Sequence, residues 1–455
     1  MKTKRAKVTY LIALLVIVGL LIFLGTSFQG KPNPVLTIDG ETVETNTPFA
    51  ATFWSLLPPI VAIALALISK EVYSSLFFGC LVGALLYTQF HPWQTIVELV
   101  GSNYGIISVL ADSYDMGIIV FLVVLGIMVD LMNKGGGSEA FGRWAKHSVK
   151  TRCGAQLITM LLGVLIFVDD YFNCLTVGAV MRPVTESHKI SRAKLAYIID
   201  ATAAPVCMIA PVSSWAAAVS GYVTSSTVNG FDMFIKQIPY NYYCLLTLVM
   251  IVVTSLLNLD YGPMLKHEYN AQVKGDLFTT EERPFEGADD YEKPAKGKSS
   301  VLDLVLPVVV LIVACIIGMI YSGGYFDGND FVSSFSDADA AVGLSIGGLI
   351  GLVFTFLYFW IRGSIDFDKS FESVPKGFIQ MIAPILILTF AWTLCSFTRN
   401  AMYSAEFVKE AMAGAGELKL FLPAIIFIIR YRLRHRHLLG HHRHHGSHCG
   451  QCLQL

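Results

Sequence analysis

The chain has 455 residues, of which 54% are hydrophobic and 15% are charged, and its formal net charge is -1. Soluble domains carry about 25% charged residues, so the composition excludes an ordinary soluble protein, and the nearly balanced charge gives no reason to expect a nucleic-acid partner. Apolar runs of membrane-spanning length recur along the chain. They predict an all-α polytopic membrane protein that contacts the lipid bilayer.

The first spans follow a basic N-terminus. Lys2, Lys4, Arg5 and Lys7 precede an apolar run at 10–27, and the positive-inside rule then places the N-terminus in the cytoplasm. The run is long for a signal peptide and lacks a clear cleavage site, so we predict an uncleaved span in the cytoplasmic membrane. Residues 1–47 combine this span with an external polar segment. The sequence predicts further spans at 50–69, 72–90 and 115–133.

The next segment, 154–183, is too short and too polar for two ordinary spans. Its apolar arms flank Asp169-Asp170-Tyr171-Phe172-Asn173, and basic residues lie at both outer ends. Because a span needs about 20 apolar residues, these arms predict a re-entrant hairpin that enters from the cytoplasm, with the two carboxylates at its tip. The alternative is that the carboxylates face cytoplasmic water or cap a helix.

Residues 195–222 predict a broken helix. Pro205 and Pro211 each remove a backbone donor, and Asp200 and the hydroxyl residues Ser213 and Ser214 lie near them. Interrupted helices hold small cations near the membrane midplane in many transporters. Asp200 could instead form a structural ion pair or a helix cap, and a serine often bonds its own helix backbone.

The candidate cation-binding residues therefore come from the hairpin and the broken helix: Asp169, Asp170, Asn173, Thr176, Asp200, Thr202, Ser213 and Ser214. Sodium prefers hard oxygen ligands of these types, and a buried carboxylate has a raised pKa, so protons compete with the ion. Sodium and protons are then the transported ions. We expect no cofactor and no metal site. The zinc-protease motif His-Glu-x-x-His does not occur in the sequence, and we predict that the protein is not an enzyme.

The remaining chain completes a first repeat (48–262) and begins a second (301–429). A span is predicted at 238–260, and the charged residues 263–300 predict a mobile cytoplasmic linker. Further spans are predicted at 301–320, 340–360 and 378–395, which gives about eleven membrane segments with the hairpin and a final apolar run before Arg430.

A resemblance to a known family rests on Phe167–Val177, Met181-Arg182-Pro183-Val184, Ile190–Tyr197, Asp200–Pro205 and Pro211–Trp215. These motifs resemble the NhaC-type sodium/proton antiporters of the ion-transporter superfamily. The resemblance implies an inverted-repeat fold with paired hairpins and broken helices, and often a homodimer. Some relatives exchange organic acids such as malate and lactate, which gives an alternative substrate class.

The tail at 430–455 departs from this resemblance. The family continues with a second hairpin whose tip is of the type Thr-Gly-Thr-Ser-Trp-Gly-Thr, whereas this chain is rich in His and Arg. A GC-rich coding of Phe-Ala-Thr-Gly-Thr-Ser-Trp-Gly-Thr, read two bases into its first codon, gives the sequence of Arg434–His441. We therefore expect an out-of-frame tail and an incomplete second repeat, which sequencing of the gene tests.

A rival function of another class is metal binding by the histidines of the tail. Zinc binding that disappears when residues 434–448 are deleted, while cation flux in vesicles persists, would distinguish this function from transport.

Overall fold

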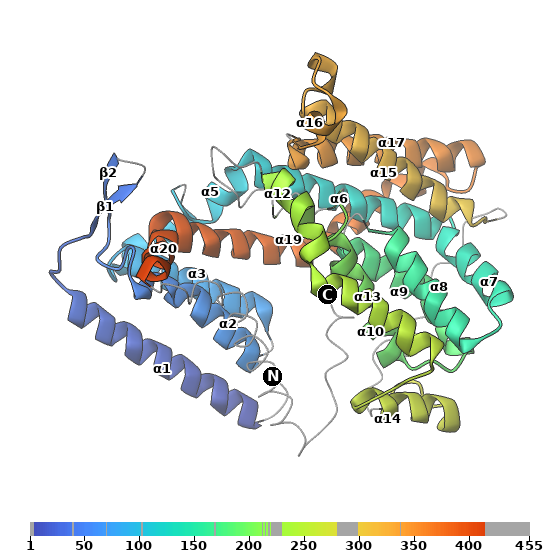
Figure 1. Cartoon of the computed structure of the whole chain (residues 1–455), viewed down its shortest axis with the longest axis horizontal. Coiled ribbons are helices and arrows are strands. Elements are labelled where there is room, and N and C mark those ends of the chain that lie inside the picture. The colour runs from blue at the N-terminus through green and yellow to red at the C-terminus, as the bar shows by residue number, and fades with distance from the viewer. Residues whose placement is uncertain are drawn as a thin grey trace. The chain divides into compact units, whose positions relative to one another are not determined.

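The computed structural model describes residues 4–38, 41–69, 71–101, 103–167, 170–211, 213, 215–216, 219, 230–279, 299–336 and 338–414 (Figure 1). These residues form two compact units. Unit 1 contains the residues up to Asp115 and those from Ala383 to Gly414, and unit 2 contains Met116–Ile382. The hairpin and the interrupted helix both belong to unit 2.

Unit 1 is helical apart from one small sheet. The predicted external polar segment contains two strands, β1 (Val35–Ile38) and β2 (Glu41–Glu44), which pair antiparallel with Val35 opposite Glu44. Their β-branched residues favour strands. The other elements are α1 (Lys4–Phe28), η1 (Phe53–Leu56), α2 (Leu57–Ser69), α3 (Val72–Tyr87), α4 (Pro92–Val100), α5 (Ile106–Ala111), the end of α19, η5 (Ser396–Ala401) and α20 (Ser404–Gly414).

Unit 2 contains the long spans and the hairpin. Its elements are α6 (Ser113–Lys134, which begins in unit 1), α7 (Gly137–Ser148), α8 (Arg152–Leu165), α9 (Asp170–Ser187), α10 (Arg192–Cys207), α12 (Gly230–Gln237), η2 (Ile238–Tyr240), α13 (Tyr242–Leu256), α14 (Pro263–Tyr269), η3 (Asn270–Lys274), α15 (Leu302–Ser322), η4 (Tyr325–Asp327), α16 (Phe331–Ser336), α17 (Ala340–Arg362), α18 (Phe367–Phe371) and α19 (Ser373–Cys395).

The length and composition of the described helices confirm a polytopic membrane protein. Four helical segments are long and apolar enough to cross a bilayer: α6, α15, α17 and the stretch Phe367–Ala401. A fifth results if the bent pair of α12 and α13, which meet at 45°, counts as one span. Shorter apolar helices cover Ile12–Phe28, Phe53–Ser69, Val72–Tyr87 and Arg152–Leu165. The last of these is the first arm of the predicted hairpin.

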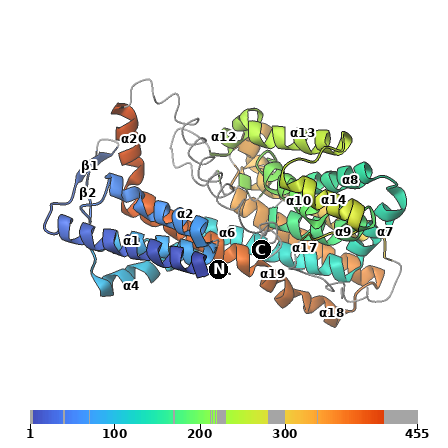
Figure 2. The same cartoon turned by 90° about the horizontal axis from the view of Figure 1, so that it is seen from below.

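The predicted mobile linker is wrong in its first part. Residues 263–274 are helical, and Glu268 and Ala271 are buried at 1% and 0% exposure. Figure 2 shows α14 alongside α10, on the same side of unit 2 as α8 and α9. Of the charges of this segment, Glu268 is buried and pairs with Arg152 of α8, whereas Lys266 and Lys274 are exposed. The remainder of the predicted linker, residues 280–298, lies outside the described residues.

Candidate functional site

The predicted hairpin consists of two helices. α8 begins after Thr151, whose hydroxyl accepts a hydrogen bond from the backbone nitrogen of Gly154 at 3.0 Å. α8 ends at Leu165, because Ile166 leaves the helical region at φ -97° and ψ 59°. α9 begins at Asp170, a half-buried residue in the first turn. The positive end of the helix dipole stabilises a carboxylate at this place.

Asn173 joins the two arms of the hairpin. Its Nδ2 donates to the carbonyl oxygens of Gly163 at 2.5 Å and Ile166 at 2.8 Å. Both amide hydrogens are therefore used, and the orientation of the amide is fixed. The amide oxygen Oδ1 is buried and has no hydrogen-bond partner among the described residues. A buried acceptor without a donor costs about 1–3 kcal/mol, so a ligand that contacted this oxygen would be stabilised by it.

Thr176 provides a second buried oxygen of the same kind. It lies three residues after Asn173 on α9 and therefore on the same face of the helix. Its exposure is 1%, and its Oγ1 has no hydrogen-bond partner within the described part of the chain. Thr185 on the same helix shows the usual arrangement, because its buried hydroxyl donates to Met181 at 2.9 Å and Arg182 at 3.0 Å. We call Asn173 Oδ1 and Thr176 Oγ1 the orphaned oxygens; Thr185 shows that they are not a general property of the buried polar residues of α9.

α10 brings a third side-chain oxygen to the hairpin. Thr202 is fully buried and donates to Ile198 at 2.8 Å and Ile199 at 3.2 Å, which leaves its oxygen lone pairs available to a ligand. A β-carbon built on Gly163 would lie 2.8 Å from the β-carbon of Thr202, closer still to its Oγ1, and 3.6 Å from Asn173 Oδ1. Because Gly163 has no side chain, Asn173 Oδ1 of α9 and Thr202 Oγ1 of α10 both lie beside it.

The helical chain is interrupted directly after α10. α10 continues through Pro205 and ends at Cys207, whose thiol donates to the carbonyl of Phe167 at 3.1 Å. Ser213 Oγ donates to the carbonyl of Cys207 at 2.7 Å and accepts from the backbone nitrogen of Ala216 at 3.1 Å. The hydroxyl of Ser213 thus caps both sides of the interruption, as N-cap side chains do.

The predicted site residues fall into three groups. Asn173, Thr176, Thr202 and Ser213 are buried. Asp170 is half-buried, and Asp200 is exposed on α10. Asp169 and Ser214 lie outside the described residues.

Sequence reasoning missed some contributors to this site. Gly163 and Cys207 were not predicted, and neither was the carbonyl of Phe167. An isolated glycine in a short apolar helix is the signal that could have identified Gly163, since such a residue usually has a packing reason.

The polar groups of this arrangement are of the types that hard cations accept as ligands. The described oxygens are amide, hydroxyl and carbonyl groups, and the residues that the structure describes contain no cluster of three or more His, Cys, Asp or Glu side chains suited to a metal ion. Oxygen-only sets without thiolate or imidazole suit hard cations rather than transition metals.

These features define a multi-pass helical membrane protein with a short hairpin and an interrupted helix. The orphaned oxygens belong to α9, the second arm of the hairpin. The comparisons with known proteins give the family. The sequence model of the family described as "Na+/H+ antiporter family" matches residues 206–430. A protein of Haemophilus influenzae (strain ATCC 51907 / DSM 11121 / KW20 / Rd), described as uncharacterized, is 32% identical over 402 residues, which cover 84% of this chain and 73% of that protein. No solved structure matches the chain.

The chain belongs to the Na+/H+ antiporter family, a family of membrane transporters. The matched range includes the interruption after Cys207 and all spans of the second half, and it ends at Arg430, where the His- and Arg-rich sequence begins. The hairpin precedes the matched range.

Proposed function

We propose that this protein exchanges sodium for protons across the cytoplasmic membrane, with its N-terminus in the cytoplasm. The observation that carries the proposal is the pair of orphaned buried oxygens, Asn173 Oδ1 and Thr176 Oγ1. They lie on one face of α9, and the Nδ2 bonds of Asn173 hold its amide in place. A bound sodium ion would satisfy both oxygens, and Thr202 could add a third ligand.

The proton needs a titratable group, which neither Asn173 nor the hydroxyls supply. The candidates are the carboxylates of Asp169, Asp170 and Asp200. Asp170 is the nearest described one along α9, one turn before Asn173. We propose that one of these carboxylates binds sodium when it is deprotonated and releases the ion when it takes a proton, which couples the two fluxes.

The test is an assay of everted vesicles from cells that lack their own sodium/proton exchangers. Addition of sodium to respiring vesicles should dequench a pH-sensitive dye when the protein is present. Thr176→Val removes one orphaned oxygen and keeps the shape of the side chain. We expect it to raise the sodium concentration for half-maximal response about tenfold, since a tenfold change corresponds to about 1.4 kcal/mol.

The matched control is Thr185→Val, which removes a hydroxyl that is buried on the same helix but already bonded to Met181 and Arg182. It should respond to sodium as the wild type does. A Thr176→Val protein with wild-type sodium dependence would contradict the proposed site. If the wild type responds to malate or lactate and not to sodium, organic-acid exchange replaces sodium/proton exchange.

A further inference from the structure

The segment 260–279, which we call the strap, folds back onto the helices of the site. It contains α14 and η3, which are flanked by two glycines with positive φ, Gly262 at 58° and Gly275 at 69°. Glycine adopts these angles without a steric penalty. The strap buries its polar residue Glu268, which is 1% exposed.

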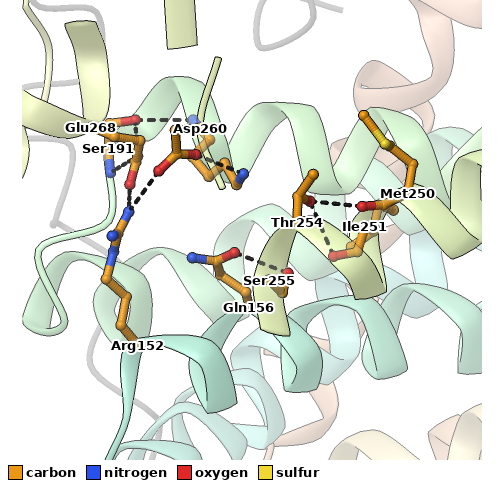
Figure 3. Close-up of polar contacts among 10 residues, drawn as sticks. Arg152, Gln156, Ser191, Met250, Ile251, Thr254, Ser255, Asp260 and Glu268 are labelled. Atoms are coloured by element: carbon orange, nitrogen blue, oxygen red, sulfur yellow. Dashed lines mark hydrogen bonds and ion pairs between the residues drawn. The ribbon is translucent and has the colours of Figure 1, made fainter. Parts of the chain in front are cut away.

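Four charges, of which Glu268 and Lys194 are buried and Arg152 and Asp260 are partly buried, connect the strap to α8 and α10 (Figure 3). Glu268 forms an ion pair with Arg152, the first residue of α8. Asp260 forms an ion pair with Lys194 at 2.9 Å and lies 3.7 Å from the guanidinium of Arg152. We call these four residues the charge clamp. Its two positive and two negative charges balance, and removal of one partner would leave a buried charge uncompensated.

The clamp also contacts the N-terminus of α10 directly. The carboxylate of Glu268 accepts hydrogen bonds from the backbone nitrogen of Ser191 at 2.9 Å and from its Oγ at 2.5 Å. Ser191 is the N-cap of α10, and its hydroxyl accepts from the backbone nitrogen of Lys194. One carboxylate of the strap therefore holds the first residue of α8 and the cap of α10 together.

Both helices extend from the clamp to the candidate ion site over the same length. Gly163 lies eleven residues after Arg152, and Thr202 lies eleven residues after Ser191, which is about 16 Å along each α-helix. At their far ends, Gly163 and Thr202 are in close contact. If the start of α10 shifted along α8, Thr202 would therefore move away from the hairpin tip.

We propose that Arg152, Lys194, Asp260 and Glu268 are positioning residues for ion exchange: they fix the register of α8 against α10 and so place Thr202 at the orphaned oxygens of α9. This proposal rests on the proposed function. If the clamp only stabilised the fold, its loss would lower stability throughout the unit. If the clamp positions α10, its loss changes the affinity for the ion and the packing at the far end of α10.

The experiment is a cycle of three variants: Glu268→Gln, Arg152→Gln and the double variant. Glu268→Gln keeps an acceptor for Ser191 but removes the carboxylate that pairs directly with Arg152, which leaves Arg152 with Asp260 at 3.7 Å. We expect each single variant to raise the half-saturating sodium concentration in vesicles about tenfold with a nearly unchanged maximal rate. The double variant should return to within about twofold of the wild type, because it leaves no uncompensated charge and its two amide side chains can still hydrogen-bond across the same contact.

A second readout does not depend on sodium transport. Cys207 at the end of α10 is buried and bonded to Phe167 at the hairpin tip. Its labelling by N-ethylmaleimide, measured by mass spectrometry of the peptide, should rise several-fold in each single variant and fall again in the double variant. Labelling of Cys315, which is buried in α15, should not change. The control variant Glu139→Gln breaks an exposed pair with Arg143 and should alter neither readout.

The outcomes separate the two proposals. If the wild type does not respond to sodium, the proposed function fails, and the labelling of Cys207 alone decides on the clamp. If the wild type responds, single variants with an unchanged half-saturating sodium concentration overturn the clamp. Unchanged labelling of Cys207 overturns it as well, and so does faster labelling of Cys207 and Cys315 together, because that pattern reports general loosening.

Discussion

Thr202 occupies the space in which a side chain on Gly163 would begin. A β-carbon at position 163 would lie 2.8 Å from the β-carbon of Thr202, a separation that real β-carbons essentially never show. α8 and α10 therefore meet at a point where only glycine fits. This contact joins the first arm of the hairpin to the interrupted helix.

The substitution Gly163→Ala should separate the two helices. We expect a loss of about 1–3 kcal/mol in stability, which is typical of an overpacked site, and a loss of the vesicle response to sodium. Gly178→Ala is the control, because its β-carbon would lie 3.7 Å from Ile199, an ordinary contact, and alanine favours a helix. Thermal unfolding in detergent measures the stability of both variants, and the vesicle assay measures their response to sodium. An unchanged midpoint for Gly163→Ala would show that the contact is not tight.

A seam of glycines on α17 makes a second prediction. α15 and α17 lie side by side (Figure 1), and a β-carbon at Gly347 would lie 2.5 Å from the backbone nitrogen of Cys315. At Gly343 it would lie 2.8 Å from the Cα of Met319. Small residues let helix backbones approach in a membrane, where van der Waals packing stabilises the contact.

We therefore expect Gly347→Ala to destabilise the protein by about 1–3 kcal/mol, since the neighbouring atoms are backbone and cannot move aside. Gly19→Ala in α1 is the control, because nothing lies within 4 Å of its β-carbon position. The midpoints of thermal unfolding in detergent should differ between the two variants. Equal midpoints would contradict the tight packing of the seam.

The sequence predicted the helices of the site well, because their signals are local. A short apolar run followed by Asp169 and Asp170 predicts the hairpin, and the structure has α8 and α9 there. The sequence could not show which face of α10 is buried. Asp200 and Thr202 are two residues apart and so point to opposite sides of the helix, and the structure buries Thr202 and exposes Asp200.

The sequence did not predict the contacts between segments that are far apart in the chain. The charges of residues 263–300 predict a solvated linker, but Glu268 in this range pairs with Arg152, which is 116 residues away. Arg152 and Lys194 were interpreted only as markers of the cytoplasmic side. Their partners become evident once the chain is folded, because hydropathy gives the location of a charge relative to the membrane and not the identity of its counterion.

Asp303 provides a third prediction, which concerns a buried charge at the start of α15. Its side chain is 0% exposed and accepts from Tyr358 Oη at 2.8 Å and from Arg362 at 2.7 Å. Arg362→Met would leave the carboxylate buried without this cation. We expect a loss of about 3–5 kcal/mol, measured by unfolding in detergent.

Two further variants check this interpretation. Lys236→Met breaks an exposed pair with Asp232 and should cost less than about 1 kcal/mol. The double variant Asp303→Asn with Arg362→Met should regain part of the loss, because the uncompensated charge is then removed. A double variant as unstable as the sum of its single variants would show that Asp303 and Arg362 act independently.

His267 in the strap gives a prediction of pH dependence. Burial lowers the pKa of its imidazole below the usual value, and Lys266 lowers it further. Asp276 and the backbone of Phe278 raise this pKa, but the net shift is downward. The folded protein therefore binds this proton more weakly than the unfolded chain does. The contribution of His267 to stability is complete above the ordinary histidine pKa of about 6.5 and is lost as the pH falls from there through the folded pKa.

His267→Gln should remove this dependence. Between pH 7.5 and 5.5, the midpoint of thermal unfolding should fall further in the wild type than in His267→Gln, by about 1 °C in a chain of this size. His91→Gln is the control, because His91 is exposed in unit 1, and its decrease should match that of the wild type. Equal decreases for the wild type and His267→Gln would mean that His267 is protonated as readily in the folded strap as in the unfolded chain.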